Sequence, residues 1–182
     1  MANPIKISVL GASGRMGRML LQAIIENENA LLVGAIEQTG HNWVGKDVGK
    51  QAFGKENGII VSDKPIDVIL KSQAIVDFTN PDASVAYSAL AAQARIVHVI
   101  GTTGFSKKQL EGIELAAQHA TVIRAGNMSL GVNLLTQLTR RVAQSLGDDY
   151  DIEILEMHHN KKLDAPSGTA LMLGEAAASG RG

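Results

Sequence analysis

The chain alternates short apolar runs with longer stretches in which apolar and polar residues mix. The apolar runs lack the regular polar positions of a half-exposed strand, which is typical of a parallel sheet covered by helices on both faces. This alternation predicts a doubly wound α/β domain. Strands are expected at residues 5–10, 31–37, 74–78, 96–100 and 121–125, and helices at about 15–26, 82–93, 107–119 and 129–146.

Two segments break this rhythm. Residues 46–58 are rich in glycine and lysine without a clear period, and we expect a surface loop there. Residues 150–157 alternate charged with apolar side chains, which predicts a half-exposed strand. We therefore expect a first domain over residues 1–128 and the beginning of a second, α+β domain over residues 129–182. Because one strand and one helix do not make a sheet, we expect this second domain to be truncated.

Composition narrows the class of protein. The chain has 17 Lys and Arg against 18 Asp and Glu, which excludes a strongly basic nucleic-acid surface. No apolar stretch approaches the roughly 20 residues that a membrane span needs. The absence of cysteine excludes disulfides and thiol catalysis and fits a reducing compartment. We expect a soluble cytoplasmic protein with neither nucleic-acid nor membrane partners.

The first predicted strand runs into Gly11-Ala12-Ser13-Gly14-Arg15-Met16-Gly17. Glycines allow a tight turn and a close approach to a pyrophosphate, which the N-terminus of the following helix then holds. Glu37 ends the next strand, 20 residues beyond Gly17, where an acidic residue binds ribose hydroxyls. The order of these features favours a Rossmann-type dinucleotide site. The alternative is a plain glycine-rich turn beside a solvated Glu37.

Two further loops follow predicted strands at their carboxyl ends: Gly101-Thr102-Thr103-Gly104 and Gly126-Asn127-Met128-Ser129. Each could be an ordinary capped turn before a helix. Ligands of open parallel sheets bind outside these strand ends. Two such loops beside a phosphate-type turn therefore favour one shared cofactor cleft.

Residues 156–170 form the segment richest in reactive groups. It contains His158, His159 and Lys162, followed by a Pro-Ser-Gly-Thr turn at Ser167 that opens the last helix. A histidine can donate a proton near neutral pH, and a lysine can hold a carboxylate or developing negative charge. The exposed N–H groups at a helix start can bind an anion.

Other interpretations of this segment stay open. It could be a solvated loop, which is the usual fate of such charged runs. A metal site is not expected, because adjacent histidines on a strand point to opposite faces. Ser167 lacks the G-x-S-x-G turn of a nucleophile. The remaining histidines, His41, His98 and His119, are expected at the surface or in loops, and Trp43 in a loop.

Four segments together resemble the 4-hydroxy-tetrahydrodipicolinate reductases, also called dihydrodipicolinate reductases. These segments are residues 11–17, 101–105, 127–133 and 156–170, of which the last is the most specific. The resemblance implies reduction of a cyclic, unsaturated dicarboxylate imine by NADH or NADPH in diaminopimelate and lysine biosynthesis. It also implies a homotetramer for full-length members, which usually continue well past residue 182. We accordingly expect a chain ending at Gly182 to show little reductase activity and no well-formed tetramer.

The resemblance also implies roles for individual residues. His158 would be the acid/base residue and Lys162 the second catalytic group, which also contacts substrate. Substrate carboxylates would be bound by His159, Ser167, Gly168 and Thr169. The cofactor would contact Gly11, Ala12, Ser13, Gly14, Arg15, Met16, Glu37, Gln38, Gly101, Thr102, Thr103, Ala125, Gly126, Asn127 and Met128.

One position departs from some relatives, and one alternative function remains. Gln38 follows Glu37 where some relatives place an arginine for the 2′-phosphate of NADPH. The alternative to a reductase is a non-catalytic NAD(P)-binding protein or an inactive fragment. Consumption of reduced cofactor would separate the two, because a binder would show affinity only.

Overall fold

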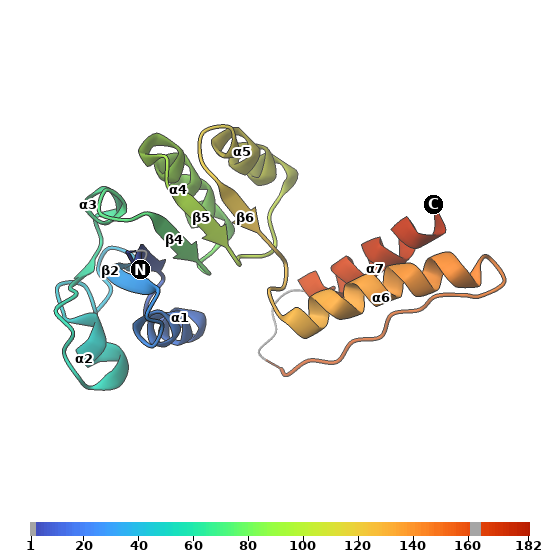
Figure 1. Cartoon of the computed structure of the whole chain (residues 1–182), viewed down its shortest axis with the longest axis horizontal. Helices are drawn as coiled ribbons and strands as arrows, with labels where there is room; N and C mark the ends of the chain where they lie inside the picture. Colours follow the sequence, from blue (N-terminus) through green and yellow to red (C-terminus); the bar gives the residue numbers. More distant parts are fainter. Residues whose placement is uncertain (1–2, 161–164) are drawn as a thin grey trace. The chain divides into compact units, whose positions relative to one another are not determined.

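The computed structural model describes residues 3–160 and 165–182. It divides into two compact units, unit 1 over Met1–Arg124 and unit 2 over Ala125–Gly182 (Figure 1). Lys162, which we expect to be catalytic, lies outside the described residues. No helix of the described part is long and apolar enough to cross a membrane.

Unit 1 contains a six-stranded sheet in the order β3-β2-β1-β4-β5-β6 (Figure 1). Every neighbouring pair of strands is parallel. The predicted doubly wound sheet is therefore confirmed, and its strand order reverses between β1 and β4. The strands are β1 (Ile5–Leu10), β2 (Ala30–Ile36), β3 (Val61–Ser62), β4 (Ala74–Asp77), β5 (Val97–Ile100) and β6 (Val122–Arg124).

Five helices join these strands and bury both faces of the sheet. Val9 and Leu10 are consecutive in β1, yet they belong to two separate apolar clusters, because successive strand residues point to opposite faces. The cluster around Val9 includes residues of α1 and α2, and the cluster around Leu10 includes residues of α3 and α4. The helices are α1 (Arg15–Ile25), α2 (Val48–Phe53), α3 (Pro65–Ile69), α4 (Pro81–Ala94) and α5 (Lys107–Ala117).

The surface loop expected at residues 46–58 is partly wrong, since it contains helix α2. Asp47 caps the helix by accepting a hydrogen bond from the Lys50 N–H at 2.9 Å. Gly54 ends it in the left-handed conformation, with φ at 77°. A helix of 6 residues is too short for an apolar period to be read from its sequence.

Two side chains expected at the surface or in loops are buried. His98 on β5 is completely buried, which corrects its assignment as a surface or loop histidine. Trp43 does lie between elements, but it is only 6% exposed and belongs to the cluster around Val9. The Arg18 guanidinium lies 4.8 Å from the centroid of the Trp43 ring.

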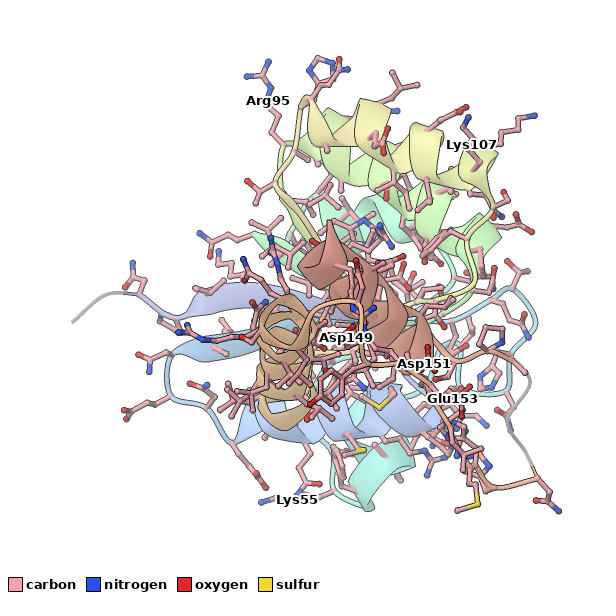
Figure 2. The ribbon with its side chains drawn as sticks, turned by 90° about the vertical axis from the view of Figure 1, so that its right-hand side faces the viewer. Lys55, Arg95, Lys107, Asp149, Asp151 and Glu153 are labelled. Atoms are coloured by element: carbon pink, nitrogen blue, oxygen red, sulfur yellow. The ribbon has the colours of Figure 1, made fainter. Side chains whose placement is uncertain are left out.

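Unit 2 is built on two helices that lie side by side, α6 (Leu130–Leu146) and α7 (Gly168–Arg181) (Figure 1). The strand expected at residues 150–157 is wrong, because the structure shows no β-bridge there. Asp151 and Glu153, labelled in Figure 2, lie on a stretch of chain that is neither strand nor helix. Alternation of polar and apolar residues becomes a strand only with a hydrogen-bonding partner, and the described residues of unit 2 contain none.

Candidate active site

The glycine turn joins β1 to α1 where the strand order reverses, which is where doubly wound sheets bind their ligands. Gly11 has a φ of 68°, which favours glycine, and its N–H donates to the Ile36 carbonyl oxygen at 2.9 Å. Gly17 is needed for another reason: a Cβ there would lie 2.1 Å from the Gly11 carbonyl oxygen. The turn is therefore folded tightly between its strand and its helix.

The start of helix α1 is suited to an anion. Gly14 occupies the N-cap position without any side-chain cap, and the first turn holds no acidic residue. Helices α3 and α6 also lack a side-chain cap, whereas α2, α4, α5 and α7 are capped by Asp47, Asn80, Ser106 and Ser167. No N-cap side chain therefore competes with an anion for the N–H groups at the start of α1.

Glu37 is drawn to this turn by a direct hydrogen bond. Its Oε1 accepts from the Ser13 N–H at 2.7 Å, and its side chain is largely buried. The Ser13 hydroxyl lies 3.2 Å from Nε2 of His41, and Arg18 Nε donates to the Ser13 carbonyl at 3.1 Å. The structure thus brings Glu37 together with the glycine turn, whereas the Gln38 side chain is exposed.

The loop after β5 is tied to β4 and α4. The Gly101 N–H donates to the Asp77 carbonyl at 2.8 Å, and the hydroxyl of Ser84 donates to Thr102 Oγ1 at 3.0 Å. Thr102 is buried. Because the strands are parallel, this loop and the glycine turn leave the same edge of the sheet.

The other predicted cofactor loop, Ala125 to Met128, belongs to unit 2. Asn127 connects it to helix α7, since its Nδ2 donates to Thr169 Oγ1 at 3.0 Å. Its Oδ1 accepts from the Ser129 N–H at 2.9 Å. Asn127 is therefore placed beside the predicted substrate residues at the start of α7.

Glu156 organises the polar segment, a role that the sequence did not reveal. Its Oε1 accepts from the Ser167 N–H at 2.8 Å, and its Oε2 accepts from the Ser167 hydroxyl. Oε2 also lies 2.8 Å from Nε2 of His158. The hydrogen bonds from the Ser167 hydroxyl and N–H, followed by that from His158, lower the pKa of Glu156 to about 2. Only the spacing Glu-x-His hints at this contact.

The contact with Glu156 orients His158. An ionised carboxylate can only accept hydrogen bonds, so Nε2 of His158 carries a hydrogen and Nδ1 points elsewhere. The His158 side chain is 38% exposed, which leaves it accessible to a ligand. His159 is also exposed. The described residues contain no group of three or more histidine, aspartate or glutamate side chains that could hold a metal ion.

Comparison with known proteins covers both units. The family model "Dihydrodipicolinate reductase, N-terminus" matches residues 5–128, and "Dihydrodipicolinate reductase, C-terminus" matches residues 131–182. The chain is 56% identical over 176 residues to the 4-hydroxy-tetrahydrodipicolinate reductase of Ruegeria pomeroyi, and 57% identical over 176 residues to that of Dinoroseobacter shibae. Each alignment covers 97% of this chain and 65% of the relative, so the chain spans about two thirds of their length.

A solved structure agrees with these matches. The fold resembles that of a dipicolinate-bound dihydrodipicolinate reductase from Paenisporosarcina sp. TG-14, with a TM-score of 0.76 and 29% sequence identity. That alignment covers 98% of this chain and 67% of the solved one. With both family models matched in order along the chain, the protein belongs to the dihydrodipicolinate reductase family.

Proposed function

We propose that this chain carries the cofactor-binding and proton-donating residues of an NAD(P)H-dependent 4-hydroxy-tetrahydrodipicolinate reductase. Its product would be tetrahydrodipicolinate, in diaminopimelate and lysine biosynthesis. The observation that supports this proposal most strongly is that Glu156 contacts both His158 and Ser167 at the N-terminus of α7. This contact supports the proposal, because it brings an imidazole that could donate a proton beside N–H groups that suit a carboxylate.

We assign residues 1–128 to cofactor binding. The uncapped start of α1 fits a pyrophosphate, which the turn from Gly11 to Met16 would surround. Its donors would be the N–H groups of Arg15 and Met16, because those of residues 11–14 already donate to the Ile36 and Gly11 carbonyls and to Glu37. Glu37 Oε2 would accept hydrogen bonds from the adenosine ribose hydroxyls. Gly101 to Thr103 and Ala125 to Met128 would line the nicotinamide side. When bound, NADH or NADPH supplies the hydride.

We assign residues 129–182 to the substrate and its proton. A dicarboxylate needs N–H donors and cations, and Gly168, Thr169, His159 and Lys162 would provide them. The Ser167 N–H and hydroxyl both donate to Glu156, so Ser167 would act by holding that carboxylate. The dipicolinate bound to the Paenisporosarcina relative is itself a dicarboxylate, which supports this ligand class.

His158 would complete the reduction by donating a proton. Hydride delivered to a conjugated imine leaves negative charge on the substrate, which a nearby acid must neutralise. Since Nε2 of His158 faces Glu156, the proton would leave from Nδ1 of the imidazolium. Glu156 stays ionised and keeps the ring in this orientation.

The test is consumption of NADH or NADPH in the presence of 4-hydroxy-tetrahydrodipicolinate, freshly prepared with the enzyme that synthesises it. In a full-length enzyme we expect turnover, with His158→Ala and Lys162→Ala each lowering kcat by roughly 100-fold or more. NADH affinity should change little in either variant. His119→Ala is the matched control, because His119 is exposed and lies just after α5 in unit 1. Affinity for NADH without any turnover would favour the non-catalytic binding protein.

Two properties of the whole protein are part of the same proposal. We propose a homotetramer for full-length members, testable by sedimentation. A cytoplasmic location is supported by the absence of cysteine and by the biosynthetic role of the named relatives. Fractionation of the native host would test it, and recovery from another compartment would contradict it.

A further inference from the structure

A buried polar pair lies beneath the carboxyl edge of the unit 1 sheet. The side chains of His98 on β5 and Asp77 at the end of β4 are both completely buried. Nε2 of His98 lies 3.3 Å from Asp77 Oδ2, and Nδ1 lies 3.0 Å from the Ser88 hydroxyl. Buried carboxylates are costly unless they are well hydrogen-bonded, so a pair at this depth calls for an explanation.

Asp77 is ionised, and its hydrogen bonds account for this. Burial would raise the pKa of Asp77, but its hydrogen bonds, first that with His98 and then those from Thr79, outweigh burial and lower the pKa below the usual value. A carboxylate can only accept hydrogen bonds, so Nε2 of His98 carries a hydrogen. His98 is therefore one of the donors that make the buried charge of Asp77 tolerable.

Asp77 holds Thr79, and Thr79 contacts the glycine turn. Its Oδ1 accepts both the Thr79 N–H, at 2.9 Å, and the Thr79 hydroxyl, at 2.6 Å. Thr79 is thereby held at two points, and its methyl group packs against Gly11. A Cβ at Gly11 would lie only 2.9 Å from Cγ2 of Thr79.

The same pair is linked to the loop after β5. The Asp77 carbonyl accepts from the Gly101 N–H at 2.8 Å. Ser88, which faces His98, donates to the Ser84 carbonyl at 2.8 Å, and the Ser84 hydroxyl donates to Thr102. The pair is therefore linked to Thr79, which contacts the glycine turn, and to Ser84, which is bonded to the Gly101–Gly104 loop.

We propose that His98 is a positioning residue for the nucleotide site, acting through Asp77 to fix Thr79 against the glycine turn and to hold the Gly101–Gly104 loop. This inference rests on the proposed cofactor role of unit 1. His98 itself is completely buried and would not touch the cofactor. Its effect would be on cofactor affinity, through the placement of Gly11 and Thr102.

The experiment measures NADH dissociation constants by calorimetry, without substrate, on the whole chain. His98→Leu removes the donor to Asp77 and should weaken NADH binding roughly tenfold or more, the scale of a lost hydrogen bond to a charged group. His98→Gln retains an N–H donor at similar reach and should recover binding to within about threefold of the unaltered protein. A purely structural role would not separate these two variants at equal folded fraction.

Two further variants keep the proposal testable if His98→Leu does not fold. Thr79→Val keeps the shape but loses the hydroxyl bond to Asp77, and should weaken NADH binding by about fivefold. Ser72→Ala is the control, because it breaks another buried pair, Ser8 Oγ to Ser72 Oγ at 2.8 Å, before β4 begins. We expect its NADH affinity to be unchanged.

The outcomes separate this inference from the proposed function. If the unaltered chain binds NADH but Thr79→Val and folded His98 variants bind it equally well, the positioning role is wrong. If Ser72→Ala loses as much affinity as Thr79→Val, general destabilisation explains the loss and the inference is also overturned. Failure of the unaltered chain to bind NADH would instead contradict the cofactor site itself.

Discussion

At the scale of single residues, we predict that the carboxylate of Glu37 decides which cofactor binds. Glu37 is fixed there by the Ser13 N–H, and the neighbouring Gln38 supplies no positive charge. A carboxylate accepts bonds from both ribose hydroxyls of NADH but repels the 2′-phosphate of NADPH. We therefore predict that NADH binds at least as well as NADPH.

Gln38→Arg should shift the ratio of dissociation constants toward NADPH, because a guanidinium can pair with the 2′-phosphate. The ratio is measured by titrating both cofactors into both proteins. Asn42→Arg adds the same charge at another exposed position nearby in the chain and serves as the control. A strong NADPH preference in the unaltered protein would contradict this account of Glu37.

Glu156 is the second residue whose role is decided by its contacts. Glu156→Gln keeps the size of the side chain but turns an acceptor into a mixed donor and acceptor, so His158 loses its fixed orientation. In a full-length enzyme we predict a kcat lowered roughly tenfold or more, with NADH affinity unchanged. Glu153→Gln, on the exposed segment labelled in Figure 2, is the matched control and should keep normal kcat. Normal turnover of Glu156→Gln would remove Glu156 from the mechanism.

The pKa of Glu156 also predicts a pH dependence. Its folded pKa of about 2 lies below the ordinary value of 4.5, so the stabilisation from its contacts is present above pH 4.5. That stabilisation is lost as the pH falls through 4.5 toward 2. Proteolysis at graded pH measures how easily unit 2 unfolds. In the unaltered chain, cleavage of unit 2 should therefore become faster only below pH 4.5. A loss that begins near neutral pH would assign the sensitivity to another group.

Single residues were predictable where chain order determines their place. Glu37 follows a strand and lies 20 residues beyond Gly17, and the structure puts its carboxylate on the Ser13 N–H. His98 was assigned wrongly, because its partner Asp77 lies 21 residues away and only the pairing of β4 with β5 brings them together. The role of Glu156 was missed for the same reason, because its partner Ser167 lies 11 residues further along the chain.

At the scale of elements, the close packing of β1, the turn and α1 makes a sharp prediction. Gly17→Ala would place a Cβ 2.1 Å from the Gly11 carbonyl oxygen and 2.8 Å from that of Ala12. The helix must move away from the strand, so we expect unit 1 to lose about 1–3 kcal/mol of unfolding free energy. NADH binding should weaken with it. Urea unfolding and NADH titration measure the two effects.

A second glycine-to-alanine change in a helix provides the control. A Cβ at Gly174 in α7 would make an ordinary contact, 3.7 Å from Ile154 Cδ1. Alanine is the better helix former by roughly 1 kcal/mol, so Gly174→Ala should be neutral or stabilising. Equal losses in both variants would show that close approach at Gly17 is not the cause.

Element prediction succeeded for long, periodic segments and failed for short or unpaired ones. The strand at residues 5–10 and the helix from Arg15 were expected and found, because each has a clear pattern of apolar residues along its length. Helix α2 has 6 residues and β3 has 2, which is too few to show a period. Residues 150–157 have the alternation of a strand but no partner among the described residues of unit 2.

At the scale of the whole molecule, the division into two units predicts where NADH protects the chain. A ligand that binds only the folded form slows the opening of the region it contacts. Hydrogen exchange with and without NADH should therefore show slower exchange in β1, the glycine turn and the start of α1. The last two turns of α7 should exchange at their original rate. Protection confined to α7 would contradict the assignment of the cofactor to unit 1.

The two central assignments are the glycine turn as the pyrophosphate site and the start of α7 as the carboxylate site. The most direct measurement is a crystal structure of this chain with NADH and dipicolinate. We predict the pyrophosphate within hydrogen-bonding distance of the backbone between Ala12 and Met16, the ribose on Glu37, and a dipicolinate carboxylate at the N–H groups of Gly168 and Thr169. A dinucleotide bound elsewhere, with the glycine turn empty, would contradict the account.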